Sequence, residues 1–240
     1  MKKTTLLTGL IFVIVILTSC EKETVNVSGE ITRVQVNLKG FTGLKVASTF
    51  NAFVTFSDTE EKIIVEANED IQNLVVVEMK DNNLEIKLKE LTNIRGNATM
   101  NVYITTKNID YYLATGASKI TLESELTAES AKIDLSGASI FTGQLNTDNL
   151  ELEAEGASKI DIFGKTGEFK AELSGGSDLL NYDFLVKNLT IALSGASNAQ
   201  LSVSETIKID AAGASSLTYE GGALVTEKHL TGASQLIKKD

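Results

Sequence analysis

The chain has 240 residues, of which 42% are hydrophobic, and it contains no Pro, no Trp and a single Cys. Its formal net charge of −10 opposes binding to nucleic acid and to anionic lipid head groups, so no nucleic-acid partner is expected. One Cys cannot form a disulfide within the chain, so stability must come from the fold itself.

Residues 1–20 have the features of a lipoprotein signal peptide. Two lysines precede an apolar run over residues 6–17, which is too short for a comfortable membrane span. The run ends in Leu17-Thr18-Ser19-Cys20, which resembles the bacterial lipobox, in which the Cys is lipidated and becomes the new N-terminus. We therefore predict lipid attachment at Cys20 and a membrane partner reached through acyl chains alone.

Residues 21–29 are polar and are predicted to form a tether between the lipid and the fold. Glu21-Lys22-Glu23 partly resembles the Lys-plus-acid signals that send some lipoproteins of the Bacteroidetes type to the outer cell surface. Removal of the leader takes away two lysines and no acid, which makes the net charge −12. The expected location is the cell envelope, as an outer-membrane lipoprotein exposed at the surface.

Residues 30–110 hold short runs in which apolar and polar side chains alternate, the pattern of half-buried strands. Residues 81–83 and 93–97 are rich in turn-forming residues and are predicted to be breaks. Residues 70–79 leave room for one helical turn, although their three consecutive valines favour a strand. The predicted strands lie at residues 31–38, 44–46, 52–56, 63–65, 74–79, 84–88 and 100–104.

Residues 111–240 are a repeat array marked by the tripeptide Gly-Ala-Ser, with Gly175-Gly176-Ser177 as a near copy. Successive glycines are 21, 19, 19, 20, 18 and 19 residues apart, and a fixed period near 20 indicates a stack of equal units. We predict an all-β parallel β-helix with coils of about 19 residues and three short faces each. The repeated corners are Gly116, Gly137, Gly156, Gly175, Gly195, Gly213 and Gly232.

The sequence suggests a structural role for each residue of the tripeptide. Gly adopts angles that a Cβ forbids, Ala is predicted to fit the inside of the turn, and Ser shares the inward parity of the apolar residue two positions later. Inward hydroxyls in a stack are predicted to hydrogen-bond from coil to coil. This Ser ladder comprises Ser118, Ser139, Ser158, Ser177, Ser197, Ser215 and Ser234.

Outward columns carry the candidate chemistry. Lys132, Glu151 and Lys170 place opposite charges side by side on adjacent coils, which helps to fix the register. Asp134, Glu153 and Glu172 form an acidic row, which favours either a solvated face balanced by the lysines or a weak candidate metal site for Ca²⁺. A Ser/His/Asp arrangement around His229 would need Asp210 with Ser215 or Ser234, but Ser occurs in every coil for structural reasons.

The two ends of such a stack have unpaired backbone groups. The early strands are expected to cap one end. At the other end, the charged residues 238–240 either blunt the edge or mark a surface for homo-oligomers.

The early strands, the segment Val102-Tyr103-Ile104-Thr105 and the repeated corners together resemble the head GIN domain family of auto-transporter adhesins, many of which are envelope lipoproteins. The resemblance covers about residues 34–235. It implies a right-handed β-helix over residues 30–240, and it supplies no catalytic residue set.

The expected function is a non-enzymatic, lipid-anchored binding module or adhesin that presents a repetitive face to an envelope, glycan or host-surface ligand, without a cofactor. The alternative is a carbohydrate-active β-helix enzyme that uses the acidic row as acid and base. Coils of 18–21 residues leave little room for the long loops that flank an enzyme groove, which favours binding.

Overall fold

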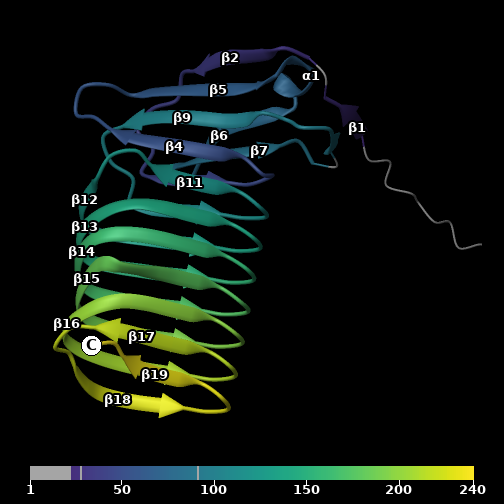
Figure 1. The fold of residues 1–240 in the computed structure, drawn as a ribbon. Coiled ribbons are helices and arrows are strands. Elements are labelled where there is room, and N and C mark those ends of the chain that lie inside the picture. Colours follow the sequence, from purple (N-terminus) through teal and green to yellow (C-terminus); the bar gives the residue numbers. More distant parts are fainter. Residues whose placement is uncertain (1–22, 28, 91) are drawn as a thin grey trace, which may run out of the picture.

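The computed structural model describes residues 23–27, 29–90 and 92–240. The predicted signal peptide, including Cys20, lies outside these residues. The fold is a parallel β-solenoid with a cap of mixed strands at its N-terminal end, which confirms the all-β prediction (Figure 1). No helix among the described residues has the length and apolar character needed to cross a membrane.

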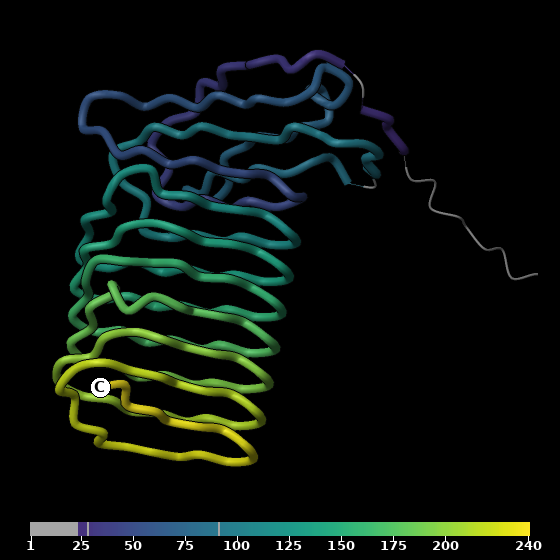
Figure 2. Tube along the Cα trace, viewed as in Figure 1, coloured from purple at the N-terminus to yellow at the C-terminus, as the bar shows by residue number. Residues whose placement is uncertain are grey.

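Each central coil is one long strand rather than three short faces, which corrects the prediction for the coil (Figure 2). Neighbouring strands are parallel, and residues 17–20 apart are register partners. Only the Gly-Ala-Ser corner interrupts the strand in each coil. The strands are β12 (Leu126–Leu135), β13 (Ile140–Ala154), β14 (Lys159–Leu173), β15 (Asp178–Leu193) and β16 (Asn198–Ala211).

Alternation along each strand places one set of side chains inside the solenoid. In β13, Phe141, Leu145, Leu150 and Leu152 are buried, whereas Gln144, Glu151 and the other residues of opposite parity are turned outward. The alternation changes phase at residues 148–149, both exposed, where the strand makes a second bend. One coil cannot bury these side chains alone, so the hydrophobic core forms only by stacking.

The coils at both ends of the array are divided into shorter strands. The first is β10 (Tyr111–Ala114) with β11 (Lys119–Leu122), and the last are β17 (Ser216–Glu220), β18 (Leu224–Leu230) and β19 (Gln235–Lys238). Within the described chain, β18 and β19 pair on one side only. The exposed Leu224 and Ile237 lie on these last strands, and the predicted self-association through the solenoid end stays a prediction.

The cap begins with β3 (Gly43–Val46) and β4 (Asn51–Phe56), which form one further coil against β10 and β11. They in turn pair with β7 (Asn83–Leu88) and β9 (Met100–Thr106). The next strands are antiparallel: β6 (Val75–Lys80) on β7, β5 (Lys62–Asn68) on β9, and β2 (Ile31–Val36) on β5. This change of direction ends the parallel stack, so the early strands do cap it as predicted.

A single helical turn, α1 (Glu69–Gln72), lies beside these strands and buries Ile71 completely. The turn precedes β6, so residues 70–79 contain both the helix and the strand that the sequence indicated. Two predictions near the cap are wrong. β1 (Glu23–Asn26) occupies part of the expected tether, and it pairs with β8 (Thr92–Arg95), which occupies part of the expected break.

Each of these two strands offers only one partly buried apolar partner to the other, Val25 and Ile94. Period-two alternation cannot be recognised in so short a pattern.

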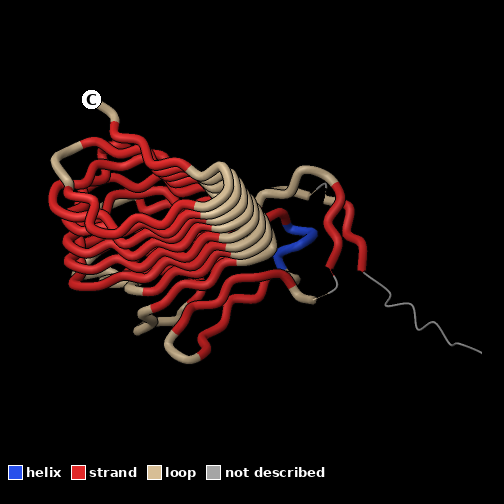
Figure 3. The backbone as a smooth tube through the Cα atoms, turned by 90° about the horizontal axis from the view of Figure 1, so that it is seen from below, coloured by secondary structure: helices blue, strands red, loops and turns tan. Residues whose placement is uncertain are grey.

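The corners form one continuous stack of loops (Figure 3). Their glycines have φ between +72° and +82°, a region that side chains with a Cβ avoid. The amide of each following residue donates to the glycine carbonyl of the preceding coil, as Ala157 N does to Gly137 O at 2.7 Å. A Cβ on Gly156 would lie 2.5 Å from that same oxygen, so both backbone angle and contact require glycine.

The other two residues of the tripeptide correct the sequence interpretation. Ala117, Ala138 and their equivalents are exposed on the outside of the turn rather than packed within it. Six of the serines are fully buried and Ser234 is half-buried, so the inward orientation holds. Each hydroxyl donates to a carbonyl of its own turn rather than to the next serine, as Ser158 Oγ does to Glu155 O at 2.9 Å. Ser234 Oγ also lies 3.0 Å from Ala211 O of the preceding coil.

Candidate functional site

The acidic row lies on a flat outer surface of the solenoid, formed by the part of each coil just before the Gly corner. We call this surface the charged face. Register pairs Asp134 with Glu153 and Glu153 with Glu172, as the sequence columns predicted. The column then continues through Ala192 and Asp210 to His229.

Two lysines form ion pairs with the carboxylates of this row. Lys132 Nζ lies 2.9 Å from Glu153 Oε1 and 3.5 Å from Asp134 Oδ1. Lys170 Nζ lies 3.2 Å from Glu172 Oε1 and 3.9 Å from Glu151 Oε1. The bond to Glu153 raises the pKa of Lys132 well above its usual range.

Among the described residues, no three His, Cys, Asp or Glu side chains lie close enough to hold a metal ion. The candidate Ca²⁺ site at Asp134, Glu153 and Glu172 is therefore not assembled, because each of its carboxylates is within ion-pairing distance of a lysine instead. This arrangement fits the solvated, charge-balanced surface that was the other interpretation of the row.

Asp134 is the most shielded member of the row. Burial raises the pKa of its carboxyl, while contacts with Tyr111 and Lys132 act in the opposite direction. Burial, followed by the contact with Asp134, raises the pKa of Tyr111 to about 12. The pair lies at the end of the array nearest the cap, and its neighbour in the row, Glu153, is ion-paired with Lys132.

The Ser/His/Asp arrangement is not formed. His229 and Asp210 are neighbours on the charged face, outside the solenoid. Ser215 is fully buried inside the solenoid, where its hydroxyl donates to Ala212 O at 2.9 Å. The hydroxyl of Ser234 lies 2.8 Å from Thr231 O of its own corner and 3.0 Å from Ala211 O of the preceding coil, and both oxygens are backbone acceptors. The repeat explains these serines completely.

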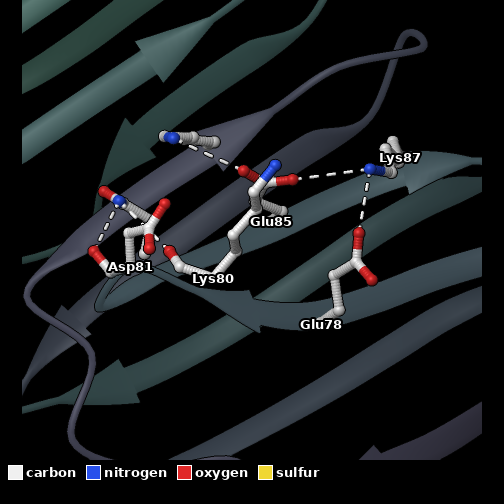
Figure 4. A network of polar contacts seen from close by, with 7 residues as sticks. Glu78, Lys80, Asp81, Glu85 and Lys87 are labelled. Atoms are coloured by element: carbon white, nitrogen blue, oxygen red, sulfur yellow. Dashed lines mark hydrogen bonds and ion pairs between the residues drawn. The ribbon is translucent and has the colours of Figure 1, made fainter.

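Charged residues also lie on the same outer side of the cap, beyond Leu113, which separates Asp134 from Lys45 in the column. Register places Leu113 of β10 beside Lys45 of β3, and Lys45 beside Glu85 of β7. There Glu85 accepts from Lys45 and Lys87, and Lys87 Nζ also lies 2.9 Å from Glu78 Oε1 on β6 (Figure 4). Ion-paired acids and lysines are therefore found on this side of both the cap and the array.

A groove that the sequence columns did not reveal follows the second bend of the coils, along the axis of the stack. It has a volume of about 560 Å³ and is open to solvent, and we call it the second-bend groove. Its lining comes from successive coils and includes Asn146, Lys165, Leu185, Val186, Lys187 and Ser202. Glycines 167, 221 and 222 also line it and add no side chain.

Beside the groove, β15 departs from the regular repeat. Its register shifts against β14 between Ile160 and Gly164, and against β16 between Leu180 and Leu185. The added segment bulges outward and is held by Asn181, whose Nδ2 donates to Asp161 Oδ1 at 2.8 Å. Bulges often redirect side chains at binding sites.

Large apolar side chains are exposed at this bulge. Phe163 is 39%, Leu180 45% and Leu185 56% exposed. All other exposed large hydrophobic residues of the described chain lie in the cap or on the last coil. Tyr182 on the bulge faces the ammonium of Lys239, which is 4.1 Å from the ring centroid and 2.7 Å from Glu220 Oε1. We call Phe163, Leu180, Tyr182 and Leu185 the apolar ledge.

One sequence signal could have located this region. Gly175 and Gly195 are 20 residues apart, between spacings of 19 and 18, so the coil of β15 is longer than its neighbours. A longer coil in a regular stack must accommodate its extra length outside the core.

A family model described as "Putative auto-transporter adhesin, head GIN domain" matches residues 40–223. The chain belongs to this family. No curated protein matches it.

Several solved structures share the fold of this head GIN domain. A protein from Bacteroides fragilis described as a putative adhesin is 18% identical, with a TM-score of 0.80 over 89% of this chain and 97% of that one. One from Parabacteroides merdae, with the same description, is 17% identical, with a TM-score of 0.74 over 91% and 100%. A structure from Parabacteroides distasonis described as a "putative lipid binding protein" is 13% identical, with a TM-score of 0.69 over 91% and 100%. At these identities the likeness shows the fold alone.

Proposed function

We propose that this head GIN domain is a non-enzymatic binding module, an adhesin held on the cell envelope by lipid at Cys20. The observation that carries the binding role is the open second-bend groove beside the apolar ledge, on a rigid stack. Exposed apolar side chains that gather next to a groove are characteristic of interaction sites. The family's association with adhesins supports the same role.

The anchor determines how the module would stand on the membrane. β1 begins at Glu23 and pairs within the cap, three residues after Cys20. Three extended residues span at most about 10 Å. A lipid on Cys20 would therefore hold the cap against the bilayer, and the coils would project away from it toward the last strands.

The charge-balanced acidic row supports a binding role over the hydrolase alternative. A hydrolase needs one carboxyl held protonated and a second one free as base or nucleophile. Here Glu153 and Glu172 are both ion-paired with lysines. The non-enzymatic proposal rests on this pairing and on the family's name.

The anchor is tested by replacing Cys20 with Ala in the full chain expressed in a bacterium of the same envelope type. We expect the wild-type protein to label with a radioactive fatty acid and to partition with membranes, and the Cys20→Ala protein to do neither. Digestion of intact cells with an added protease then reports surface exposure. Equal membrane partitioning of both proteins would rule out the lipid anchor.

Binding is tested with the soluble chain that starts at residue 21, applied to whole cells and to extracellular matrix. We expect saturable binding that competes with unlabelled protein. A chain that binds no cell, matrix or envelope fraction would overturn the adhesin role.

A further inference from the structure

We infer that the second-bend groove binds an extended, uncharged glycan chain that lies along the axis of the stack. This inference rests on the proposed binding function and names the chemical class of its ligand. It follows from the residues that line the groove, from the adjacent apolar ledge, and from the backbone hydrogen bonds of the surrounding strands, which are already formed between coils.

The lining is suited to a sugar because it combines apolar carbon with hydrogen-bonding groups. Leu185, which is exposed, together with the side-chain-free glycines gives apolar contact for the C–H faces of a sugar ring. Asn146, Ser202 and Lys165 provide donors and acceptors for hydroxyl groups. An apolar lining with a few placed polar groups is the usual composition of a small-molecule site.

The apolar ledge extends this surface on the same outer side of the coils. Phe163 lies two residues before Lys165, and Leu185 belongs both to the ledge and to the groove lining. An exposed aromatic ring next to a groove offers a face on which a sugar can stack.

The backbone around the groove argues against a peptide ligand. Thr147 pairs with Thr166, Thr166 with Val186, and Val186 with Val203 across successive coils. Coil-to-coil pairing therefore uses the strands along the groove, and there is no free strand edge for a peptide to extend.

Charge argues against a polyanion. The chain carries a formal net charge of −10, although the groove lining itself combines one carboxylate, that of Asp148, with the ammonium groups of Lys165 and Lys187. The long-range potential of such a protein repels a polyanion, whereas a neutral glycan is unaffected. Neither Lys165 nor Lys187 forms an ion pair within the part of the chain that the structure describes, which leaves both ammonium groups available to hydroxyl oxygens.

The repeat gives the groove the right period for a polymer. Register-related positions recur once per coil, at a spacing of ~4.8 Å. This spacing is close to the rise per residue of an extended β-linked polysaccharide. Successive sugars would meet successive coils, through Asn146, Lys165, Leu185 and Ser202.

The test uses the soluble chain from residue 21 and a panel of neutral polysaccharides: cellulose, β-1,3-glucan, mannan, xylan and chitin. We expect retention on at least one of them, with heparin as the charged comparison. Ser204→Trp fills the groove from an exposed position, and Leu185→Asn removes exposed apolar contact. Each change should weaken binding to the retained polysaccharide by roughly tenfold or more.

The matched control is Ala192→Trp, which adds the same large side chain to an exposed position of the neighbouring strand β15, on the charged face. It should bind like wild type. The thermal unfolding midpoint of each variant is measured to check that the fold is retained. Unchanged binding by both groove variants, or retention on heparin but on no neutral polysaccharide, would overturn the inference.

Periodate oxidation of target cells distinguishes this inference from the proposed function. Loss of cell binding after oxidation supports a glycan ligand. Cells that are bound equally well before and after oxidation, together with no retention on β-1,3-glucan, whose linkage leaves no vicinal diol to oxidise, would refute the glycan while leaving the adhesin role intact.

Discussion

The cap and the repeat array build the same corner from different residues. Register aligns Val46 with Ala114 and Asn51 with Lys119, so residues 47–50 of the cap coil occupy the place of residues 115–118. Where the array has Gly-Ala-Ser, the cap has Ser48, Thr49 and Phe50. Ser48 and Thr49 have φ of 60° and 68° without being glycine.

The difference shows why the array needs glycine. A Cβ added to Gly116, next to the cap corner, would meet no atom within 4 Å. The same atom on Gly156 would collide with the carbonyl of Gly137. Positive φ alone is tolerated at one cap corner, but the close approach of stacked corners is not compatible with a side chain.

The largest expected effect comes from the cap side of this comparison. Phe50 is fully buried at the position where the array has a serine. Phe50→Ala should lower the free energy of unfolding by about 3–5 kcal/mol, because a large core side chain is lost. Ser118→Ala in the adjacent coil removes only the hydroxyl that donates to Thr115 O and should cost about 1 kcal/mol.

Urea denaturation followed by circular dichroism measures both changes. The m-value, which is the slope of the free energy of unfolding against urea concentration, must also be compared, because a repeat array that unfolds in parts changes this slope. Equal losses for the two variants would show that Phe50 does not support the cap core.

The next prediction separates two costs of replacing a corner glycine: the backbone strain of a positive φ and the steric clash of the added Cβ with the neighbouring corner. Gly116→Ala should cost about 1–2 kcal/mol, which is the price of a left-handed alanine. Gly156→Ala has nearly the same φ and adds the clash, so its cost should rise by a further ~1–3 kcal/mol. The same denaturation experiment compares them, and equal costs would mean that the stacked corners can separate freely.

The array was predictable from the sequence because the same pattern of glycine and apolar residues recurs in every repeat. Seven glycines in register define the corners, and the apolar columns beside them define the inside. The same reasoning failed for the alanine and for the direction of the serine hydroxyl, because parity fixes the side of a strand but not the orientation of groups within a turn. Hydrogen-bond partners at a corner depend on dihedral angles that the repeat does not encode.

The cap and the groove were less predictable because they depend on residues without a repeated counterpart. β1 and β8 recognise each other through one apolar contact, Val25 with Ile94, across a long separation in sequence. The apolar ledge results from a register shift in a single coil, which one irregular spacing indicates without showing where the extra residues emerge. The acidic row was aligned correctly, but its neutralisation required side-chain positions.

The smallest expected effect is a difference in pH dependence between the cap and the array. In the cap, Glu66 accepts hydrogen bonds from Asn101 Nδ2 and Arg33 Nε, both at 2.8 Å, and these bonds lower the pKa of its carboxyl. In the array, burial raises the pKa of Asp134. Two carboxylates of one molecule should therefore respond to acid in opposite directions.

The signs follow from proton binding in the two states. Glu66 contributes stability above its unfolded pKa of about 4.3, and this contribution is lost as pH falls through the lower folded value. Asp134 is protonated more readily in the folded state, so its ionisation destabilises the fold at neutral pH and this penalty disappears as pH falls. Hydrogen exchange at pH 7 and pH 4 should show Glu66→Gln weakening protection of β5 and β9 mainly at the higher pH. Asp134→Asn should preserve or increase protection of β12 there, and a loss of protection in β12 at pH 7 would show that Asp134 is stabilised by Lys132 more than it is penalised by burial.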